Sequence, residues 1–214
     1  AGDMEYAWTT SWGVSTRLIG AIIMTHSEDD GLILPPRVAP VKVAVIPIGA
    51  DEEKLRSRIL PEAKEISARL DRSLGERSAL VDNRFHLRPA DRFFSHLQKG
   101  VPLRVELGEK DLENGTGRVV RRDTGEKIDI PLADLPGRIP GILEDMQSSL
   151  YAKALNFRKE NTVSVSSYEE FVRVMEEKGG FVETFFAGDL EDEKRSKEAT
   201  GATPRCMPMD CEER

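Results

Sequence analysis

The alternation of apolar and polar positions predicts strands and helices along most of the chain. Residues 41–48 are mostly apolar, as expected for a strand buried on both faces of a parallel sheet. Residues 55–74 carry apolar side chains every three or four positions, which predicts a helix that Pro61 should kink or divide. The alternation of strands and helices indicates an α/β sheet with right-handed crossovers. Further predicted elements of this sheet are strands at 78–82 and 101–107 and a helix at 91–98.

The C-terminal part of the chain has the pattern of an edge hairpin followed by a small α+β unit. Polar turn residues at 123–126 separate the two strands of the hairpin. A long amphipathic helix follows, and Ser167 with Glu170 forms a capping-box pattern before the next apolar stretch. The elements predicted here are strands at 117–122, 127–132 and 181–186, and helices at 142–161 and 190–197.

The N-terminal residues predict the end of a larger domain. Residues 5–11 have the aromatic and β-branched composition of a strand, and a helix with Ser15 as its N-cap is predicted through about His26. One strand and one helix cannot form a core without partner strands. The proline-rich residues 35–40 are predicted to be a linker to a new domain.

Composition excludes wholesale disorder and several classes of protein. The 214 residues are 39% hydrophobic and 32% charged, with a formal net charge of -7, so any nucleic-acid site must be a local basic patch. No apolar run approaches the roughly 20 residues that cross a bilayer, and the N-terminus lacks a basic signal region, so we expect a cytoplasmic protein. Cys206 and Cys211 cannot form a disulfide framework, and they are half of a zinc site at most.

The first candidate site is the junction between the N-terminal strand and helix. A helix N-terminus offers unpaired N–H groups and a positive potential, and Arg17 adds a planar set of donors that suits a phosphate. Gly13 would permit a close approach of ligand or backbone. By spacing alone, an arginine at a helix start is more often a surface residue, and Trp12 is more typical of a core.

The second candidate site is a basic stretch interleaved with aromatic residues. Cations and aromatic rings together suit the phosphates and unpaired bases of RNA. The alternative is that Phe93 and Phe94 are core residues and that the basic side chains form a solvated face. The candidate RNA-binding residues are Arg84, Arg88, Arg92, Lys99 and Arg104.

Several segments resemble prolyl-tRNA synthetases, which are class II aminoacyl-tRNA synthetases. Residues 10–21, 24–26 and 31–40 resemble the motif 3 region of that family, with Thr-Ser-Trp-Gly and Arg-Leu-Ile-Gly-Ala as the most specific part. Residues 99–108 and 121–127 resemble its anticodon-binding domain, and residues 200–208 resemble its additional C-terminal domain. The resemblance therefore spans nearly the whole chain.

The resemblance implies a fold class and a domain plan. It predicts an α/β protein with three parts, of which the first is a fragment of the class II catalytic antiparallel sheet. The second would be a Rossmann-like α/β anticodon-binding domain, and the third a small α+β domain that is incomplete at its end. The implied ranges are 1–37, 38–140 and 141–214.

The resemblance also implies a reaction and its residues. Proline and ATP, accompanied by Mg²⁺, would form prolyl-adenylate, and the prolyl group would then pass to tRNA(Pro). Arg17 would be the catalytic motif 3 arginine that holds ATP phosphate and stabilises charge on it. The proline and ATP pocket would contain Ser11, Trp12, Gly13 and Ser15 in addition to Arg17. The complete enzyme would be a homodimer, and this chain alone would be catalytically incomplete.

Two departures from the family pattern affect these expectations. Most relatives have Lys-Phe-x-x-Trp-Glu-Leu-Lys-Gly where residues 92–100 read Arg-Phe-Phe-Ser-His-Leu-Gln-Lys-Gly, so Leu97 replaces the acidic residue that would accept from an anticodon guanine. Family members that bind zinc have cysteines at the positions of Ala187 and Asp192, so we expect no metal in this domain.

Two other functions remain open on the sequence alone. The chain could be a non-catalytic RNA-binding module of the anticodon-binding type, which would bind RNA in a salt-sensitive way without any preceding domain. It could also be a structural or dimer-forming remnant, which would bind neither RNA nor nucleotide.

Overall fold

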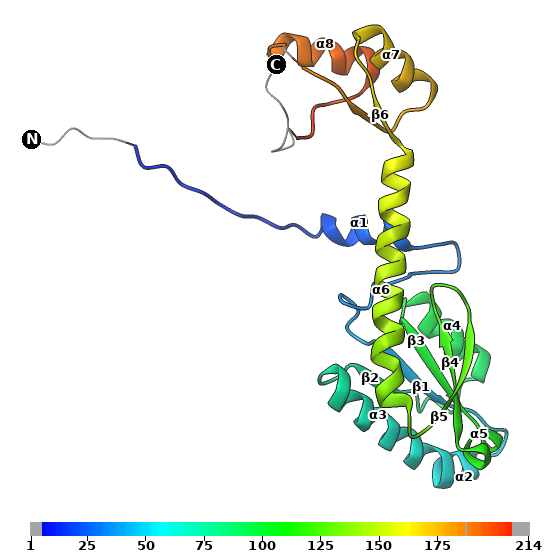
Figure 1. The fold of residues 1–214 in the computed structure, drawn as a ribbon. Helices are drawn as coiled ribbons and strands as arrows, with labels where there is room; N and C mark the ends of the chain where they lie inside the picture. The colour runs from blue at the N-terminus through cyan, green and yellow to red at the C-terminus, as the bar shows by residue number, and fades with distance from the viewer. Residues whose placement is uncertain (1–5, 187, 207–214) are drawn as a thin grey trace, which may run out of the picture. The chain divides into compact units, whose positions relative to one another are not determined.

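The computed structural model describes residues 6–186 and 188–206 and has two compact units (Figure 1). The first unit comprises residues 1–151 and the second residues 152–214. Within the described residues, no helix is both long enough and apolar enough to span a membrane.

The first unit contains a five-stranded mixed sheet with the order β2-β1-β3-β4-β5. β1 pairs in parallel with β2 on one side and with β3 on the other, whereas β4 is antiparallel to both β3 and β5. The predicted α/β sheet and its edge hairpin are therefore present. The strands are β1 (Val43–Pro47), β2 (Ala79–Val81), β3 (Leu103–Leu107), β4 (Thr116–Arg121) and β5 (Lys127–Pro131).

The helix predicted between the first two strands is divided, as Pro61 indicated. A π-helical turn, η1, leads directly into the main helix α3, and Pro61 lies in the first turn of α3. The helical elements of this unit are α1 (Arg17–His26), α2 (Glu52–Lys54), η1 (Leu55–Ile59), α3 (Leu60–Leu74), α4 (Pro89–Gln98), α5 (Glu109–Asn114) and the start of α6 (Leu135–Glu160).

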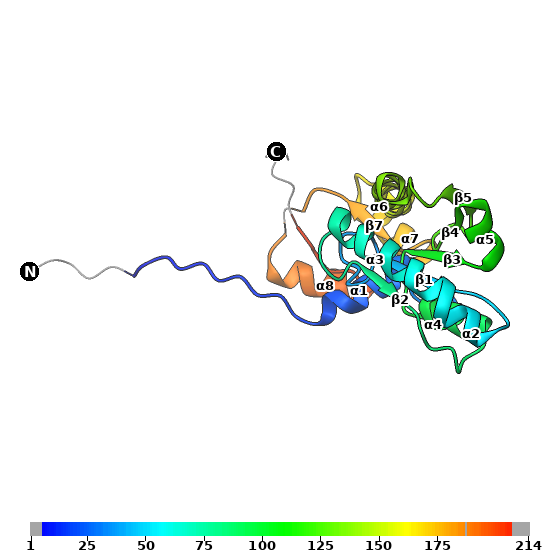
Figure 2. The ribbon, with the colours of Figure 1, turned by 90° about the horizontal axis from the view of Figure 1, so that it is seen from below.

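The hydrophobic core lies between α3, α6 and one face of the sheet. Val43, Val45 and Val105 point to this face because side chains alternate along a strand. From the helices, residues such as Ile66 and Met146 pack against them. The two views in Figures 1 and 2 show α4 on the opposite face. This arrangement leaves the α4 side of β3, β4 and β5 as the polar face of the sheet.

The helix α6 begins seven residues earlier than its apolar pattern predicted. Pro140 lies inside it and removes one backbone hydrogen bond. The Leu135 and Ile139 side chains are nevertheless fully buried in the core. We attribute the early start to this packing, because burial of two large side chains outweighs one lost hydrogen bond.

The predicted N-terminal strand is absent from the described residues 6–11, and Glu5 lies outside them. An extended segment has unpaired backbone groups until a partner strand is present, so sequence propensity alone does not make a strand. The helix α1 forms as predicted but begins after Thr16, and the Ser15 hydroxyl accepts from the Arg17 amide at 3.3 Å.

The proline-rich stretch predicted to be a linker is packed against the first unit. Pro35, Pro36 and Ala39 are buried. The Arg37 amide donates to Gln147 of α6, and its guanidinium forms a 2.8 Å ion pair with Glu144. Proline limits the conformations of a linker, but burial and hydrogen bonds fix it in place.

The second unit is a small α+β arrangement, as predicted. Its strands pair in parallel, and Ser167 caps α7 by accepting from the Glu170 amide at 3.2 Å. In a complete capping box the Glu170 carboxylate would accept from the amide of the N-cap residue Ser167, but here it accepts from the amide of Ser166. The elements are β6 (Thr162–Ser164), α7 (Tyr168–Glu177), β7 (Phe181–Glu183) and α8 (Leu190–Thr200).

Candidate nucleic-acid interface

A buried polar cluster lies at the carboxyl end of β2. Asp82 follows this strand, and its side chain is only 1% exposed. Its two carboxylate oxygens accept from Arg84, at 3.0 Å from Nε and 2.7 Å from Nη2. Nε2 of His96 on α4 lies 2.8 Å from Oδ2. Asp82 therefore joins the loop after β2 to α4 through charge-assisted hydrogen bonds.

The cluster holds Asp82 ionised and His96 neutral. Burial by itself would raise the pKa of Asp82, but hydrogen bonds from Arg84 and His96 outweigh burial and hold this pKa well below 3.8. Burial lowers the pKa of His96 below 6.5, and the hydrogen bond to Asp82 offsets only part of that effect. We therefore assign the imidazole hydrogen to Nε2, which leaves Nδ1 buried with no hydrogen-bond partner among the described residues.

Arg92, a predicted RNA-binding residue, is a buried part of this cluster. Only 1% of the residue is exposed. Its guanidinium donates to the backbone oxygens of Pro47 at 2.9 Å and Asp82 at 3.2 Å, and it lies over the Phe85 ring at 5.6 Å from the centroid. These contacts join the ends of β1 and β2 to α4. In this structure the Arg92 side chain has a structural role and is not accessible to RNA.

Arg84 is only partly accessible, whereas Arg88 and Lys99 are on the surface. The Arg84 side chain is 35% exposed and its guanidinium is held by Asp82. The Arg88 side chain is 83% exposed and forms a 3.0 Å ion pair with Asp91. Lys99 follows the end of α4 and is exposed. An exposed ion pair contributes little stability, so Arg88 can exchange Asp91 for a phosphate at small cost.

Arg104 lies on the polar face of the sheet beside α4. Its Nε donates to Glu106 at 2.8 Å, and its guanidinium carbon lies 4.5 Å from the centroid of the Phe93 ring. Phe94 is 50% exposed, so the two phenylalanines differ: one supports an arginine and the other faces solvent. An exposed aromatic ring is able to stack on an unpaired base.

The strand register places two further cations on the polar face, and sequence reasoning missed both. Glu106 pairs with Arg118, and Val120 pairs with Lys127, so Arg118 and Lys127 point to the same face as Arg104. Arg118 forms an exposed ion pair with Asp129. Alternation along each predicted strand could have indicated which face each residue occupies, but the hairpin register was needed to place these cations beside one another.

A shallow cavity of about 360 Å³ lies at the end of this face. His96 and Leu97 of α4 and Arg104 of β3 line one part of it. Leu97, where the sequence comparison predicts a departure from the family pattern, therefore borders the cavity. Other lining residues carry both signs of charge, namely Glu28, Asp30, Arg121, Arg122, Asp123 and Lys127.

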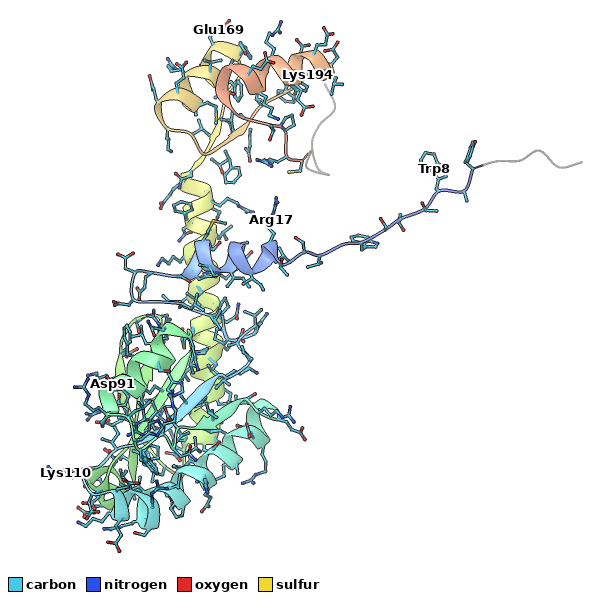
Figure 3. The ribbon with its side chains drawn as sticks, turned by 180° about the vertical axis from the view of Figure 1, so that it is seen from behind. Trp8, Arg17, Asp91, Lys110, Glu169 and Lys194 are labelled. Carbon is cyan, nitrogen blue, oxygen red and sulfur yellow. The ribbon has the colours of Figure 1, made fainter. Side chains whose placement is uncertain are left out.

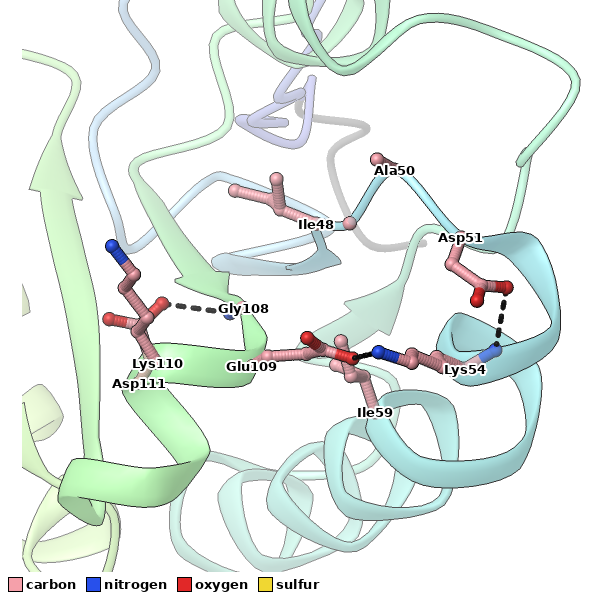
Figure 4. Close-up of a pocket in the computed structure, with 10 residues that line it drawn as sticks. Ile48, Ala50, Asp51, Lys54, Ile59, Gly108, Glu109, Lys110 and Asp111 are labelled. Carbon is pink, nitrogen blue, oxygen red and sulfur yellow. Dashed lines mark hydrogen bonds and ion pairs between the residues drawn. The ribbon is translucent and has the colours of Figure 1, made fainter.

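A second cavity, of about 390 Å³, lies at the carboxyl ends of β1 and β3 (Figure 4). Lys54 and Glu109 form a 3.3 Å ion pair there. The Asp51 carboxylate caps α2 by accepting from the Lys54 amide, and the Asp111 carboxylate accepts from the Gly108 amide. The charged groups labelled in Figure 4 other than Lys110 are thus engaged with one another or with helix ends.

The predicted proline and ATP residues do not form a pocket in this structure. Ser11, Trp12, Gly13, Ser15 and Arg17 are all exposed, and 93% of Trp12 is accessible rather than packed in a core. Figure 3 shows Arg17 at the start of α1, with the extended residues leading away from it. A pocket that includes these side chains would need further polypeptide.

Metal ligation has no support in the part of the chain that is described. Residues 6–186 and 188–206 contain no group of three or more His, Cys, Asp or Glu side chains that could hold a metal ion. Cys206 is free and exposed. Cys211 and Ala187 lie outside the described residues.

Comparison with known proteins finds matches in both units. Residues 42–141 match the family described as anticodon binding domain, and residues 168–214 match the one described as prolyl-tRNA synthetase, C-terminal. The proline–tRNA ligases of Roseiflexus castenholzii and Phocaeicola vulgatus are 45% and 43% identical to the chain, over 97% and 98% of its length. A solved structure of prolyl-tRNA synthetase from Cryptosporidium parvum, complexed with L-proline and AMP, superposes with a TM-score of 0.79 at 34% identity over 91% of the chain.

The chain matches the C-terminal part of prolyl-tRNA synthetases over nearly its whole length. It covers 42% of the length of each of these three relatives and corresponds to the C-terminal part of a prolyl-tRNA synthetase. The resemblance predicted from the sequence and the α/β fold class are thereby confirmed. The anticodon-binding match, over residues 42–141, includes the five-stranded sheet and the helices α3 and α4.

Proposed function

We propose that this chain is the part of a proline–tRNA ligase that binds the anticodon of tRNA(Pro) and contributes motif 3 to the catalytic site. Residues 1–37 would belong to the catalytic domain, residues 38–140 would bind the anticodon, and residues 141–214 would form the additional domain. The complete ligase would activate L-proline with ATP and Mg²⁺ and transfer it to tRNA(Pro). We propose that it acts as a cytoplasmic homodimer.

The observation that carries this proposal is the match of residues 42–141 to the anticodon binding domain. The accessible cations of that domain support it. Arg88, Lys99, Arg118 and Lys127 offer accessible positive charge, and the ring of Phe94 on α4 is exposed, in a chain whose net charge is -7. A local cationic surface of this kind is what an acidic protein needs to bind RNA.

Within the catalytic part, Arg17 would hold ATP phosphate. An exposed arginine at the N-terminus of a helix combines its own charge with the positive end of the helix dipole. Ser11, Trp12, Gly13 and Ser15 would line the proline and ATP pocket once the rest of the catalytic domain covers them. The proline carboxylate would attack the α-phosphorus of ATP and pyrophosphate would leave, so no nucleophile is required of this chain.

RNA binding by the chain is tested by titrating a tRNA(Pro) anticodon stem-loop, with fluorescence anisotropy at several salt concentrations. We expect the affinity for RNA to fall as the salt concentration rises. Protein binding releases counterions from the RNA phosphates, and this release is less favourable at high salt. Lys99→Ala should weaken binding about threefold to tenfold and reduce the salt dependence by the equivalent of about one contact.

The matched control is Lys64→Ala, which removes an exposed lysine from α3 on the other face of the sheet. It should leave the affinity unchanged. Equal losses for the two variants would contradict a specific interface, and no binding at any salt concentration would overturn the proposal. Binding by the chain together with no proline-dependent pyrophosphate exchange by the longer polypeptide would indicate a non-catalytic RNA-binding module.

A further inference from the structure

Arg122 makes contacts that connect the anticodon-binding domain to the residues before it. We call residues 28–34 the strap, because they run from the end of α1 to the buried prolines. The Arg122 side chain is 8% exposed. Its guanidinium donates to the backbone oxygens of Leu32 at 2.9 Å and Gly31 at 3.3 Å, and it pairs with the Glu28 carboxylate. Three of its acceptors thus belong to the strap.

The same guanidinium also contacts the end of α4. Nε of Arg122 lies 3.3 Å from the Leu97 backbone oxygen, so one planar group joins α4 to the strap. Arg122 is itself fixed, because its amide donates to the Pro102 oxygen at 2.9 Å. A lysine at this position would offer one ammonium point and could not reproduce the planar arrangement of donors.

Backbone contacts continue the attachment on both sides of Lys99. The Leu32 amide donates to the Gln98 oxygen at 3.2 Å, and the Leu34 amide donates to the Gly100 oxygen at 3.4 Å. Two glycines permit this approach. A Cβ on Gly31 would lie 2.7 Å from Gln98 Cα, and a Cβ on Gly100 would lie 2.7 Å from Leu32 Cβ. The strap therefore rests directly on the residues that flank an exposed cation of the proposed interface.

We infer that Arg122 is a positioning residue that fixes the strap, and with it the chain leading to α1, on the anticodon-binding domain. This inference rests on the proposed function, because the position of α1 matters only if the preceding residues belong to a catalytic domain. Arg122 would touch neither the anticodon nor ATP. Its effect would be to set where the 3′ end of a bound tRNA meets the catalytic site.

The first test measures hydrogen exchange of backbone amides in the chain. In Arg122→Gln we expect the Leu32 and Leu34 amides to exchange about tenfold faster or more, while the β1 amides keep their protection. The control Arg69→Gln removes an arginine of α3 that donates to one backbone oxygen, that of Ala133, and should change neither strap amide. Unchanged protection of both amides in an Arg122→Gln protein whose β1 amides remain protected would overturn the inference.

The second test compares three readouts in the longer ligase. Arg122→Gln should lower kcat/KM for charging tRNA(Pro) about tenfold, while proline-dependent pyrophosphate exchange and stem-loop affinity remain within about twofold of wild type. Charging at the wild-type rate, or a parallel loss in all three, would contradict a positioning role. A wild-type protein that binds no stem-loop would instead contradict the proposed function.

Glu28→Gln keeps the tests decisive if Arg122→Gln does not fold. This change removes one charged partner at the exposed end of the strap and leaves the buried guanidinium with its backbone acceptors. It should give a smaller rise in exchange at Leu32, of about twofold to threefold, in a fully folded protein. Protection equal to wild type in Glu28→Gln would then overturn the inference.

Discussion

Asp82 is the residue on which the packing of α4 depends. Its carboxylate accepts from Arg84 and from His96, and its backbone oxygen accepts from Arg92. Arg84 belongs to the same loop as Asp82, whereas Arg92 and His96 come from α4, so the cluster joins this loop to the helix and does not fix local conformation alone. Buried ionic groups are costly unless all of their hydrogen bonds are made. Loss of one partner therefore affects the remaining ones.

Arg92→Ala should destabilise the domain and should not act mainly on RNA. The change leaves the Pro47 and Asp82 backbone oxygens without a buried donor, and we expect the free energy of unfolding to fall by about 3 kcal/mol. Arg88→Ala, at an exposed position on the same helix end, should change it by less than about 0.5 kcal/mol. Urea denaturation of both variants measures the difference, and equal stabilities would refute the structural role of Arg92.

The stability of the domain should fall as the pH drops below about 6.5. The folded state holds the pKa of His96 below 6.5, so the unfolded chain takes up the proton first and becomes relatively more stable. Below about 3.8, protonation of Asp82 in the unfolded chain adds a further loss of the same sign. His96→Gln should flatten the dependence between pH 7 and pH 5.

The comparison for this pH effect is His86→Gln, at an exposed histidine. Its unfolding free energy should follow the wild-type profile. Thermal or urea unfolding across pH 4 to 8 measures all three proteins. A His96→Gln profile as steep as that of wild type would show that another group is responsible.

At the scale of helices and strands, close backbone approach decides where glycine is required. Gly100 has a φ of +70°, and its neighbour Leu32 leaves no room for a side chain. Gly141 lies inside α6, and a Cβ added to it would have no neighbouring atom within 4 Å. The same residue type therefore has opposite effects at these two positions.

Gly100→Ala should lower the free energy of unfolding by about 2 kcal/mol, because it combines an unfavourable φ with a steric overlap. Gly141→Ala should raise it by about 0.5 to 1 kcal/mol, because alanine reduces the conformational freedom of the unfolded chain without a clash. Denaturant midpoints of the two single variants provide the test. A destabilised Gly141→Ala variant would mean that the surface of α6 at this position is covered in solution.

The elements with strong periodicity were predictable from the sequence, and those defined by distant partners were not. β1, α3, α4 and the hairpin were predicted because their apolar patterns are continuous. The short helix α5 and the strand β6 have too few residues to show a period. The N-terminal strand was predicted wrongly for residues 6–11, since its composition suits a strand but no partner strand is present among the described residues.

The candidate site was predictable in its location but not in the roles of its residues. Arg88 and Arg92 look alike in the sequence, yet one is exposed and the other buried. The partner that decides the role of Arg92, the Pro47 oxygen, is 45 residues away. Arg122 was visible only as part of a family segment, because its acceptors in the strap lie 90 and more residues earlier.

At the scale of the whole molecule, the chain is shorter than the relatives that it matches. It spans 42% of the length of its relatives, and the predicted nucleotide-binding residues are exposed. With an overall charge of -7, the proposed binding of RNA would depend on the local cationic face. Its proposed catalytic residue therefore needs to be tested in the longer polypeptide.

Arg17→Ala in the longer polypeptide should slow proline-dependent pyrophosphate exchange roughly a hundredfold. This corresponds to a loss of about 3 kcal/mol of transition-state stabilisation. Stem-loop binding should not change, because Arg17 lies outside residues 42–141. Arg158→Ala, at an exposed arginine of α6, is the control and should exchange at the wild-type rate. Full exchange activity in Arg17→Ala would refute its assignment as the motif 3 arginine.

The continuity of α6 limits how this protein can be divided or recombined. The helix belongs to the first unit as far as Tyr151 and to the second from Ala152. The anticodon-domain match ends at residue 141, but Leu143 and Met146 are part of the first core. A chimaera joined at the end of that match would replace core side chains as well as a domain. Exchange of the C-terminal unit between relatives would therefore need a junction beyond Tyr151.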